Sequence, residues 1–458
     1  MKKKLSFFLV IIFIINTLAL NPDTSFAAEY PAAPEVSGSS AILMEADTGA
    51  VLYEKNSHKK LYPASITKVM TGLLTIENCN MEDIVTYSGK ALSSLPFDAA
   101  KLGLVSGEEM TVKDSLYALL LRSCNDAAVG LAYHISGSEE EFAKLMTKRA
   151  KELGATDTSF VNASGLQDEN HYTTAYDMAM ITKAAINNPI FTEISGTESY
   201  VLPTTNKCNV ERTQVNRHQM LVSTSTNYYP YAIAGKTGYT DEAGRTLVTV
   251  AKKDGKTLIC VFMNSTDEEV FNDTKNLFEY GFNHFDKVNI AENETRFNQD
   301  TKDFFVKMKD VFVNQGGLLN VGKGDYVMVP EGASMSDLKY EVEYLDDTSK
   351  GEVAQVKYYF GNKYMGSTKL SIEQKQEETG NVSPVKTEQD NESSKIANIP
   401  INIWLFILGI LVLIGIIVYI VYFIKTKDKR KRKRERRRVF KESKQRFKRR
   451  KRRKIKFR

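Results

Sequence analysis

The sequence predicts an α+β fold in which one antiparallel sheet is built from both ends of a domain. Two observations support this prediction. Segments rich in β-formers open the domain and return near its end, and the long stretch between them has helical periodicity. Strands on both sides of a run of helices, without strict β–α alternation, are typical of this class. The 458 residues are enough for two or three domains.

The first predicted element is a hairpin, because the apolar segments 41–44 and 51–53 flank the turn residues Asp47, Thr48 and Gly49. The remaining elements of this domain follow in order: helices from Ser65 to about Glu77, over 112–135 and over 139–153, then strands over 232–240, 245–253 and 257–265. The dipeptide Asp254-Gly255 predicts a tight turn between the last two strands. The domain is expected to span residues 29–292.

A second, smaller domain is predicted over residues 293–373. Short β-rich pieces such as YVMVP, YEVEY and EVAQVKYYF alternate there with Gly, Asp and Ser, which indicates an all-β fold. Residues 374–399 are mostly Gln, Glu, Ser, Asn and Lys with few large apolar side chains. Such a segment cannot bury a core, so a solvated linker is predicted.

Two apolar runs predict membrane-related segments near the chain ends. Residues 1–28 begin with lysines, continue as an apolar run and end in small residues, the layout of a secretory signal peptide. Residues 400–424 hold no charge and are long enough for a transmembrane helix, with Trp404 near one edge and Tyr419 near the other. The alternative for either run is a buried helix of a soluble domain.

The formal net charge of +6 conceals a strong asymmetry. Residues 425–458 carry 23 Lys/Arg and three acidic residues, a balance of +20, so residues 1–424 sum to −14. A nucleic-acid arm is one interpretation of such a tail. Because the tail directly follows a predicted membrane span, a cytoplasmic anchor that contacts anionic lipid is the preferred prediction. We therefore expect an extracytoplasmic catalytic domain on a single-pass membrane protein, with no nucleic-acid partner.

The sequence lacks the patterns of metal, cofactor and histidine-based sites. The five histidines form no H-E-x-x-H pair, and neither a G-x-S-x-G elbow nor a phosphate-binding glycine loop is present. The four cysteines show no C-x-x-C unit, and although they are compatible with disulfides outside the cell, their pairing does not follow from the sequence. No metal and no cofactor is predicted, so a hydrolase here needs another base.

A serine–lysine pair is the candidate for that chemistry. The pattern S-x-x-K occurs four times, but only Ser65 and Lys68 open an apolar helix, where residues three apart share a face. The amide of Ser65 lies in the first turn, among the unpaired donors that are able to face an oxyanion. A free lysine titrates near 10.4 and a useful base near 7–8, a difference of about 4 kcal/mol. Burial or a second cation must supply it.

Two patches downstream are able to enclose this pair. Ser123 and Asn125, between two helical runs, offer a hydroxyl for proton relay and an amide for a peptide group. Lys236, Thr237 and Gly238, on a predicted strand edge, offer a cation, a hydroxyl and close backbone approach to an extended peptide. Each patch alone is compatible with an ordinary turn, but their order after S-x-x-K is far more specific.

With these motifs the sequence resembles the serine-type D-Ala-D-Ala carboxypeptidases, low-molecular-mass penicillin-binding proteins of the active-serine penicillin-recognising family. The resemblance runs from about residue 41 to 285 and includes PASITKVMTGLL, SCNDAAVGLA, NASGLQDENHYTTAYDMA, AGKTGYTDEAG and FEYGF. It implies a β-lactamase/transpeptidase-like catalytic domain followed by a small all-β domain. The implied partners are peptidoglycan stem peptides that end in D-Ala-D-Ala, and β-lactams.

The resemblance also implies residue roles in the reaction. Ser65 attacks the carbonyl of the penultimate D-Ala and becomes acylated, and Lys68 takes its proton. Ser123 passes a proton toward the leaving amine, with the assistance of Lys236. An oxyanion hole is formed by the backbone N–H groups of Ser65 and Tyr239.

The same resemblance implies how the substrate is held. Asn125 binds the peptide, Thr237 and Lys236 bind the terminal carboxylate, and Gly238 lets the strand approach. Arg217, in VNRHQML, resembles a carboxylate-contacting arginine of some family members.

Several alternatives stay open at this point. Cys124, between Ser123 and Asn125, is a candidate second nucleophile, although no base is paired with it in the sequence. D,D-endopeptidase action on cross-links uses the same groups. A β-lactam sensor or wall-binding module with little turnover would keep the same residues, and a β-lactamase would need an added carboxylate base that the sequence does not reveal.

Overall fold

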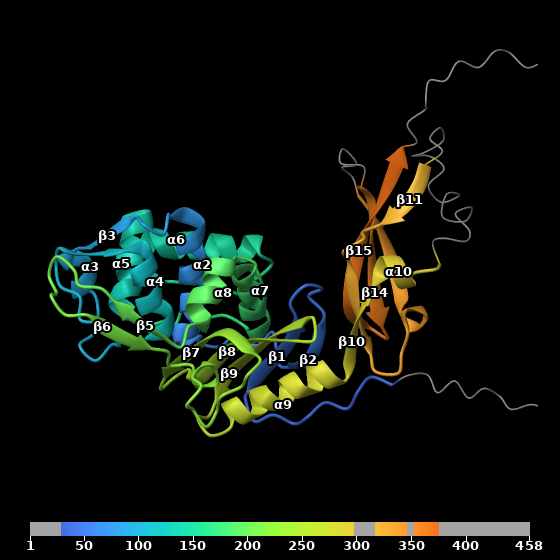
Figure 1. Cartoon of the computed structure of the whole chain (residues 1–458), viewed down its shortest axis with the longest axis horizontal. Helices are drawn as coiled ribbons and strands as arrows, with labels where there is room; N and C mark the ends of the chain where they lie inside the picture. The colour runs from blue at the N-terminus through green and yellow to red at the C-terminus, as the bar shows by residue number, and fades with distance from the viewer. Residues whose placement is uncertain (1–28, 297–316, 346–351, 375–458) are drawn as a thin grey trace, which may run out of the picture. The chain divides into compact units, whose positions relative to one another are not determined.

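The computed structural model describes residues 29–296, 317–345 and 352–374 (Figure 1). Up to residue 215 the elements are β1 (Ser40–Glu45), β2 (Val51–Lys55), the 3₁₀ helix η1 (Ala64–Thr67), α2 (Lys68–Asn78), β3 (Ile84–Tyr87), α3 (Gly89–Ser93), β4 (Glu108–Thr111), α4 (Val112–Leu121), α5 (Asn125–Ser136), α6 (Glu139–Glu152), α7 (Ala175–Ile186), α8 (Pro189–Gly196), β5 (Ser199–Leu202) and β6 (Arg212–Val215). The later elements are η2 (Gln219–Leu221), β7 (Ala232–Thr240), β8 (Gly244–Lys253), β9 (Lys256–Ser265), α9 (Val270–Asn283), β10 (Phe285–Asn289), α10 (Ile290–Asn293), β11 (Gly317–Val321), β12 (Tyr326–Pro330), η3 (Met335–Asp337), β13 (Lys339–Tyr344), β14 (Glu352–Phe360) and β15 (Lys363–Gln374).

The central sheet has five antiparallel strands in the order β2-β1-β9-β8-β7. The first hairpin therefore joins strands that lie about two hundred residues later, with Ile42 opposite Val261. This arrangement confirms the predicted antiparallel sheet built from both ends of the domain. Strand β7 lies at one edge of the sheet, so one of its sides is free of strand pairing among the described strands.

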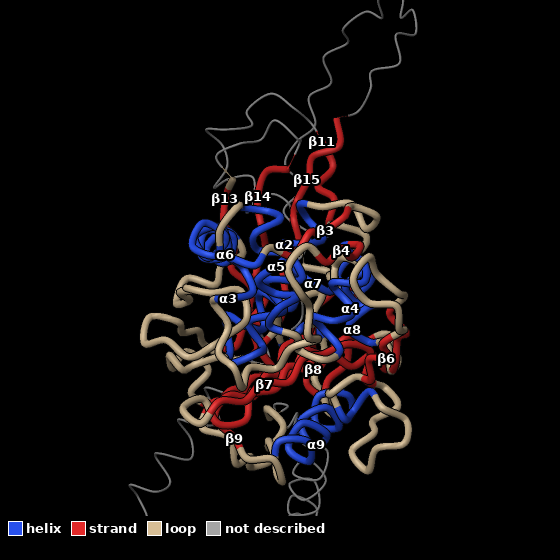
Figure 2. The backbone as a smooth tube through the Cα atoms, turned by 90° about the vertical axis from the view of Figure 1, so that its left-hand side faces the viewer, coloured by secondary structure: helices blue, strands red, loops and turns tan. Residues whose placement is uncertain are grey.

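Both faces of this sheet are buried, and alternate residues serve different layers. On β1, Ile42 and Met44 pack into the core beneath the helical cluster, whereas Ala41 and Leu43 belong to the core that contains α9. The period of two follows from the pleat, which points successive side chains to opposite faces. Figures 1 and 2 show the result, with the helices α2, α4, α5, α7 and α8 over one face and α9 along the other.

The helices begin where short polar side chains cap their free amides. The hydroxyls of Thr111, Ser138 and Thr174 accept hydrogen bonds from the amides three residues later, at the starts of α4, α6 and α7. The predicted helical run 112–135 is interrupted at 122–124, which leaves Ser123 in the gap between α4 and α5. The run predicted from Ser65 begins as the 3₁₀ turn η1 and becomes α-helical at Lys68.

A second antiparallel sheet holds β10-β12-β15-β14-β13, with β11 paired to β15. The all-β character predicted for the later residues is thus present in the described part. Strand β10 precedes residue 293, yet it pairs with β12 and belongs to this sheet.

All four cysteines are unpaired thiols in the structure. No helix among the described residues is both long and apolar enough to span a bilayer. The predicted signal peptide, the linker from residue 375, the apolar run 400–424 and the basic tail lie outside the described residues.

Candidate active site

The nucleophile candidate Ser65 lies in a tightly held turn. It occupies η1, directly after Ala64, whose φ of +49° is unusual for a residue with a Cβ. The carbonyl oxygen of Pro63 accepts a hydrogen bond of 2.8 Å from the Thr246 hydroxyl on β8. The turn is therefore fixed against the central sheet, next to strand β7.

Lys68, the first residue of α2, is completely buried against this turn. Its Nζ lies 2.6 Å from the Ser164 carbonyl oxygen, 2.7 Å from Asn125 Oδ1 and 3.1 Å from Ser65 Oγ. A neutral amine has two N–H groups and one lone pair. The two shorter contacts end on oxygens that only accept, so they take both N–H groups. The lone pair then faces Ser65 Oγ, which is the arrangement a general base requires.

Burial lowers the pKa of Lys68 to about 7. The Cys124 thiol opposes this shift and the Arg217 guanidinium adds to it, while the carboxylates of Asp126 and Glu139 oppose it weakly. The expected contribution of burial is present, but Lys236, the second cation expected from the sequence, is not among the causes of the shift at Lys68, and Arg217 is the cation that adds to burial. Lys236 is affected in turn. Burial, and then the charge of Lys68, hold the pKa of Lys236 well below its ordinary value.

The gap between α4 and α5 presents the second motif. Ser123 has a φ of +63°, and its buried Oγ has no hydrogen-bond partner among the described residues. Asn125 opens α5 and uses its Oδ1 for Lys68, so its side-chain N–H groups remain available to a ligand. Burial raises the pKa of the Cys124 thiol to about 12. A thiol with so high a pKa is a poor nucleophile at neutral pH, which argues against the second-nucleophile interpretation.

The third motif lies on the edge strand β7. The Lys236 side chain is buried and donates a hydrogen bond of 2.8 Å to the Thr237 carbonyl. Gly238 has no room for a side chain, because a Cβ there would lie 2.8 Å from the Ser65 amide nitrogen. The absence of that atom lets the β7 backbone come up beside Ser65. Tyr239, the next residue, is 55% exposed.

These motifs meet at a cleft of about 790 Å³. Its lining residues include Ser65, Pro96, Asp98, Ser123, Asn125, Ser164, Leu166, Arg217, Thr237, Gly238, Tyr239, Glu242 and Arg245. Of the nine predicted site residues, seven line the cleft directly. The other two, Lys68 and Lys236, are fully buried lysines whose charges interact. The structure thus brings the whole predicted set together.

Arg217 is held in the cleft by its neighbours in the chain. Its amide donates to the Leu121 carbonyl at 3.0 Å. The Asn216 side chain donates to the carbonyls of Ser195 and Thr197 and accepts the amide of His218, all within 3.0 Å. These bonds fix the backbone of Arg217 beside the cleft, and the charge of its side chain helps to lower the pKa of Lys236.

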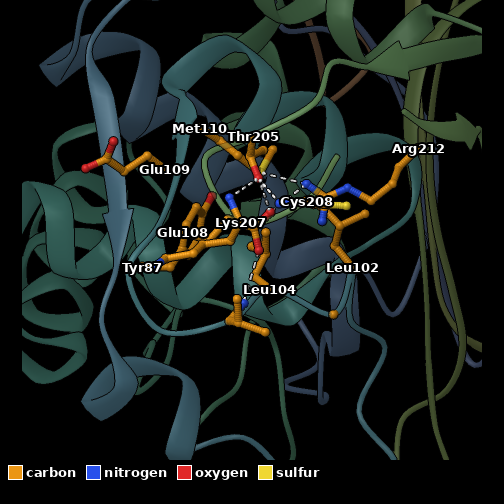
Figure 3. A network of polar contacts seen from close by, with 12 residues as sticks. Tyr87, Leu102, Leu104, Glu108, Glu109, Met110, Thr205, Lys207, Cys208 and Arg212 are labelled. Carbon is orange, nitrogen blue, oxygen red and sulfur yellow. Dashed lines mark hydrogen bonds and ion pairs between the residues drawn. The ribbon is translucent and has the colours of Figure 1, made fainter. Parts of the chain in front are cut away.

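A buried ion-pair network around Glu108 holds one end of the loop 94–107 (Figure 3), and residues earlier in this loop line the cleft. The carboxylate of Glu108 is 1% exposed and accepts hydrogen bonds from the Val105 amide, the Thr205 hydroxyl and Arg212. Nearer the site, Asp126 accepts the amides of residues 102, 103 and 104 at 2.9–3.1 Å. Each of these two carboxylates accepts several hydrogen bonds, so the loop is held over residues 102–105, at the end that leads into β4.

Two contributors to the site were missed from the sequence. The Ser164 carbonyl is one of the two acceptors on Lys68, and Arg245 lines the cleft with its guanidinium 5.2 Å from the Tyr239 ring centroid. Ser164 lies in the segment NASGLQDENHYTTAYDMA. This segment supported the family resemblance, but none of its residues was assigned a role. Arg245 follows the third motif on the next strand, and its side chain also pairs with Asp267.

Comparison with known proteins agrees with this geometry. The model of the D-alanyl-D-alanine carboxypeptidase family matches residues 27–267. The D-alanyl-D-alanine carboxypeptidase DacF of Bacillus subtilis is 37% identical over 318 residues, which cover 68% of this chain and 77% of the relative. Penicillin binding protein 5 of Haemophilus influenzae has a TM-score of 0.59 at 25% identity, covering 75% of this chain and 98% of that structure. Penicillin binding protein 6B of Escherichia coli has a TM-score of 0.55 at 26% identity, covering 75% and 97%.

Proposed function

Because the chain belongs to the D-alanyl-D-alanine carboxypeptidase family and is a serine D,D-carboxypeptidase, we propose that Ser65 and Lys68 carry out its reaction in the cleft. The observation that supports this assignment is the contact between Lys68 Nζ and Ser65 Oγ. It joins a hydroxyl to a buried amine whose pKa of about 7 leaves much of it unprotonated at neutral pH. A base of this strength matches the operating pH.

The acylation step follows from the three contacts of Lys68. Its lone pair takes the proton of Ser65, and Oγ bonds to the carbonyl carbon of the penultimate D-Ala. The resulting oxyanion is stabilised by the backbone N–H groups of Ser65 and Tyr239, which the close approach of Gly238 brings together. The C–N bond then breaks, and the leaving amine receives a proton through the Ser123 hydroxyl. Water later cleaves the ester and regenerates Ser65.

Substrate binding uses the edge strand β7 and polar side chains in and beside the cleft. An extended peptide pairs with the open side of β7 through backbone hydrogen bonds. The terminal carboxylate is held by the Thr237 hydroxyl and the Arg217 guanidinium, with the buried Lys236 behind them. The Asn125 side-chain N–H groups, which Lys68 leaves free, donate to a carbonyl of the stem peptide. β-Lactams acylate Ser65 by the same first step.

The apolar and basic segments outside the described residues are proposed to anchor this enzyme. An N-terminal signal peptide (1–28) directs export, a helix over 400–424 spans the bacterial cell membrane, and the tail 425–458 lies in the cytoplasm against anionic lipid. The uninterrupted apolar run and the +20 charge that follows it support this topology. Protease treatment of intact cells should remove the catalytic domain and spare the tail, and the reverse pattern would refute this topology.

The test of the reaction uses the full-length protein in detergent with a pentapeptide that ends in D-Ala-D-Ala. Release of D-Ala is expected from the wild type and is expected to be lost in Ser65→Ala and Lys68→Arg, because an arginine cannot act as a free base. Equal release from wild type and Ser65→Ala would refute the assignment of the nucleophile. Stable penicillin labelling without D-Ala release would favour a sensor.

A further inference from the structure

The loop over residues 161–166 lies behind Lys68 and is unusually well fixed for an irregular segment. Asn162 Oδ1 accepts the backbone amides of Ser164, Gly165 and Leu166 at 2.7–3.2 Å, and its Nδ2 donates to the Leu166 carbonyl at 2.9 Å. One side chain therefore closes the loop on itself. The loop matters because the Ser164 carbonyl is one of the two acceptors that orient Lys68.

The same loop presses closely on the turn that carries Ser65. Gly165 has a φ of +84°, and a Cβ there would lie 1.8 Å from the Ala64 carbonyl oxygen. His171 ties the loop to this turn as well. Its Nδ1 accepts the Val161 amide at 3.2 Å, so its Nε2 carries the proton and donates to Thr67 Oγ1 at 2.8 Å. The position of the Ser164 carbonyl thus depends on these contacts and on those that hold the loop on its other side.

Glu139, the first residue of α6, provides that outer support. Its Oε1 accepts the Ala163 amide at 3.1 Å, while the Ala163 carbonyl accepts the Thr71 hydroxyl of α2 at 2.6 Å. Glu139 therefore holds one side of a peptide segment whose other side is bound to the helix of Lys68. Burial raises the pKa of Glu139, and the Ala163 amide and the Lys68 charge oppose that shift.

The two glutamates that follow behave differently. Glu140 and Glu141 pair with Lys144 on the same helix and are mostly exposed, as is usual for acidic residues in a first helical turn. All three residues favour the start of the helix by their charge. Of the three, only Glu139 accepts a hydrogen bond from the loop, so it has a function that helix capping does not explain.

We propose that Glu139 is a positioning residue for acylation, which holds the Ser164 carbonyl on Lys68 through the Ala163 amide and thereby directs the lone pair of Lys68 at Ser65. The inference rests on the proposed role of Lys68 as the base. Glu139 does not line the cleft, and the cleft-lining residues Ser164, Gly165 and Leu166 keep their bonds to Asn162. Its loss is therefore expected to act on the reactivity of Ser65 and to leave the binding of substrate unchanged.

The test measures acylation of the full-length protein by a fluorescent penicillin, with rate and dissociation constants obtained separately between pH 6 and 9. Glu139→Ala removes the acceptor, and Glu139→Gln keeps an amide oxygen that accepts the same bond. Glu140→Gln is the matched control, because it changes a charge in the same turn at a residue that pairs with Lys144 and is not hydrogen-bonded to the loop. Lys68→Arg reports on the role of the base itself.

Glu139→Ala is expected to lower the acylation rate constant about ten- to a hundredfold, a typical effect of misplaced catalytic groups, with the dissociation constant unchanged. Glu139→Gln is expected to stay within about threefold of the wild type. In both variants the acid limb of the rate profile should move to lower pH. The reason is that Glu139 is one of the groups facing Lys68 that raise its pKa, with Cys124 and Asp126, against Arg217.

A rate for Glu139→Ala equal to that of Glu140→Gln would overturn the inference. So would a loss of tenfold or more in the acylation rate constant of Glu139→Gln, which keeps the acceptor for the Ala163 amide, and this outcome decides the question alone if Glu139→Ala does not fold. If Lys68→Arg is acylated as fast as the wild type, the proposed function of Lys68 is wrong. Loss of acylation in Lys68→Arg together with an unaffected Glu139→Ala would refute only the role of Glu139.

Discussion

Lowering the pH from 8 to 6 is expected to slow acylation of Ser65 by about tenfold, because Lys68 with a pKa of about 7 is then mostly protonated. The free-base fraction falls from about 90% at pH 8 to about 9% at pH 6. The fall from an ordinary pKa of 10.5 to about 7 corresponds to about 5 kcal/mol, at 1.36 kcal/mol per pH unit. Complete burial of the side chain, with Arg217 nearby, is the structural source of that energy.

The assay is stopped-flow acylation by a fluorescent penicillin, with circular dichroism at each pH to verify that the fold persists. The rate should rise tenfold per pH unit at low pH and level off above pH 8. Lys68→Arg should be slow at every pH. A rate that continues to rise tenfold per unit up to pH 10 would mean that Lys68 titrates normally, and a flat profile would mean that it is not the base. Either result would refute the reasoning from burial.

Three further predictions concern the fold around the site. Gly238→Ala should reduce acylation by a hundredfold or more in kinetic assays, since the new Cβ would lie 2.8 Å from the Ser65 amide and separate the two oxyanion donors; near-normal acylation would contradict this. Burial lowers the pKa of His171 and of His218 to about 4. As the pH falls below 6.5, both histidines therefore become protonated in the unfolded chain while they stay neutral in the folded protein. Stability should therefore decrease between pH 6.5 and 4 by about 1.4 kcal/mol per pH unit for each histidine, measured by urea denaturation; a constant midpoint would contradict it. Asp126→Ala should cost about 2–4 kcal/mol in the same measurement, because three loop amides lose their acceptor, and a change below about 0.5 kcal/mol would argue against that anchor.

The residues of the three motifs that act through their side chains were predictable from the sequence, whereas Arg245 was not. Ser65, Lys68 and Lys236 carry chemistry in side chains at recognisable spacings, and the structure brings them together. The antiparallel sheet was also predictable, because alternating apolar segments stand on both sides of the helical region. Sequence reasoning required burial or a second cation around Lys68, and in the structure burial is the larger cause.

The contributions that depend on a backbone group or on a single tertiary contact were not predictable. The Ser164 carbonyl has the same chemistry in every residue type, so no side-chain pattern indicates that it binds Lys68. Glu139 looks like its neighbours in an acidic first turn, and only the tertiary contact with Ala163 separates it from them. Strand β10 was missed for a similar reason. Its five residues give too short a pattern to show which of the two sheets it joins.

The pairing of β1 with β9 has a consequence for how the enzyme is made. Ile42 of β1 cannot pair with Val261 of β9 until that residue, about 220 positions later, has been synthesised. At roughly 5–20 residues per second, synthesis of that stretch takes roughly 10 to 40 s. Strand β7, which supplies the Gly238 contact to Ser65, is held in the sheet only through β8 and β9. A nascent chain therefore carries its serine and lysine long before it is able to react, and reactivity toward penicillin should appear only once β9 has been synthesised.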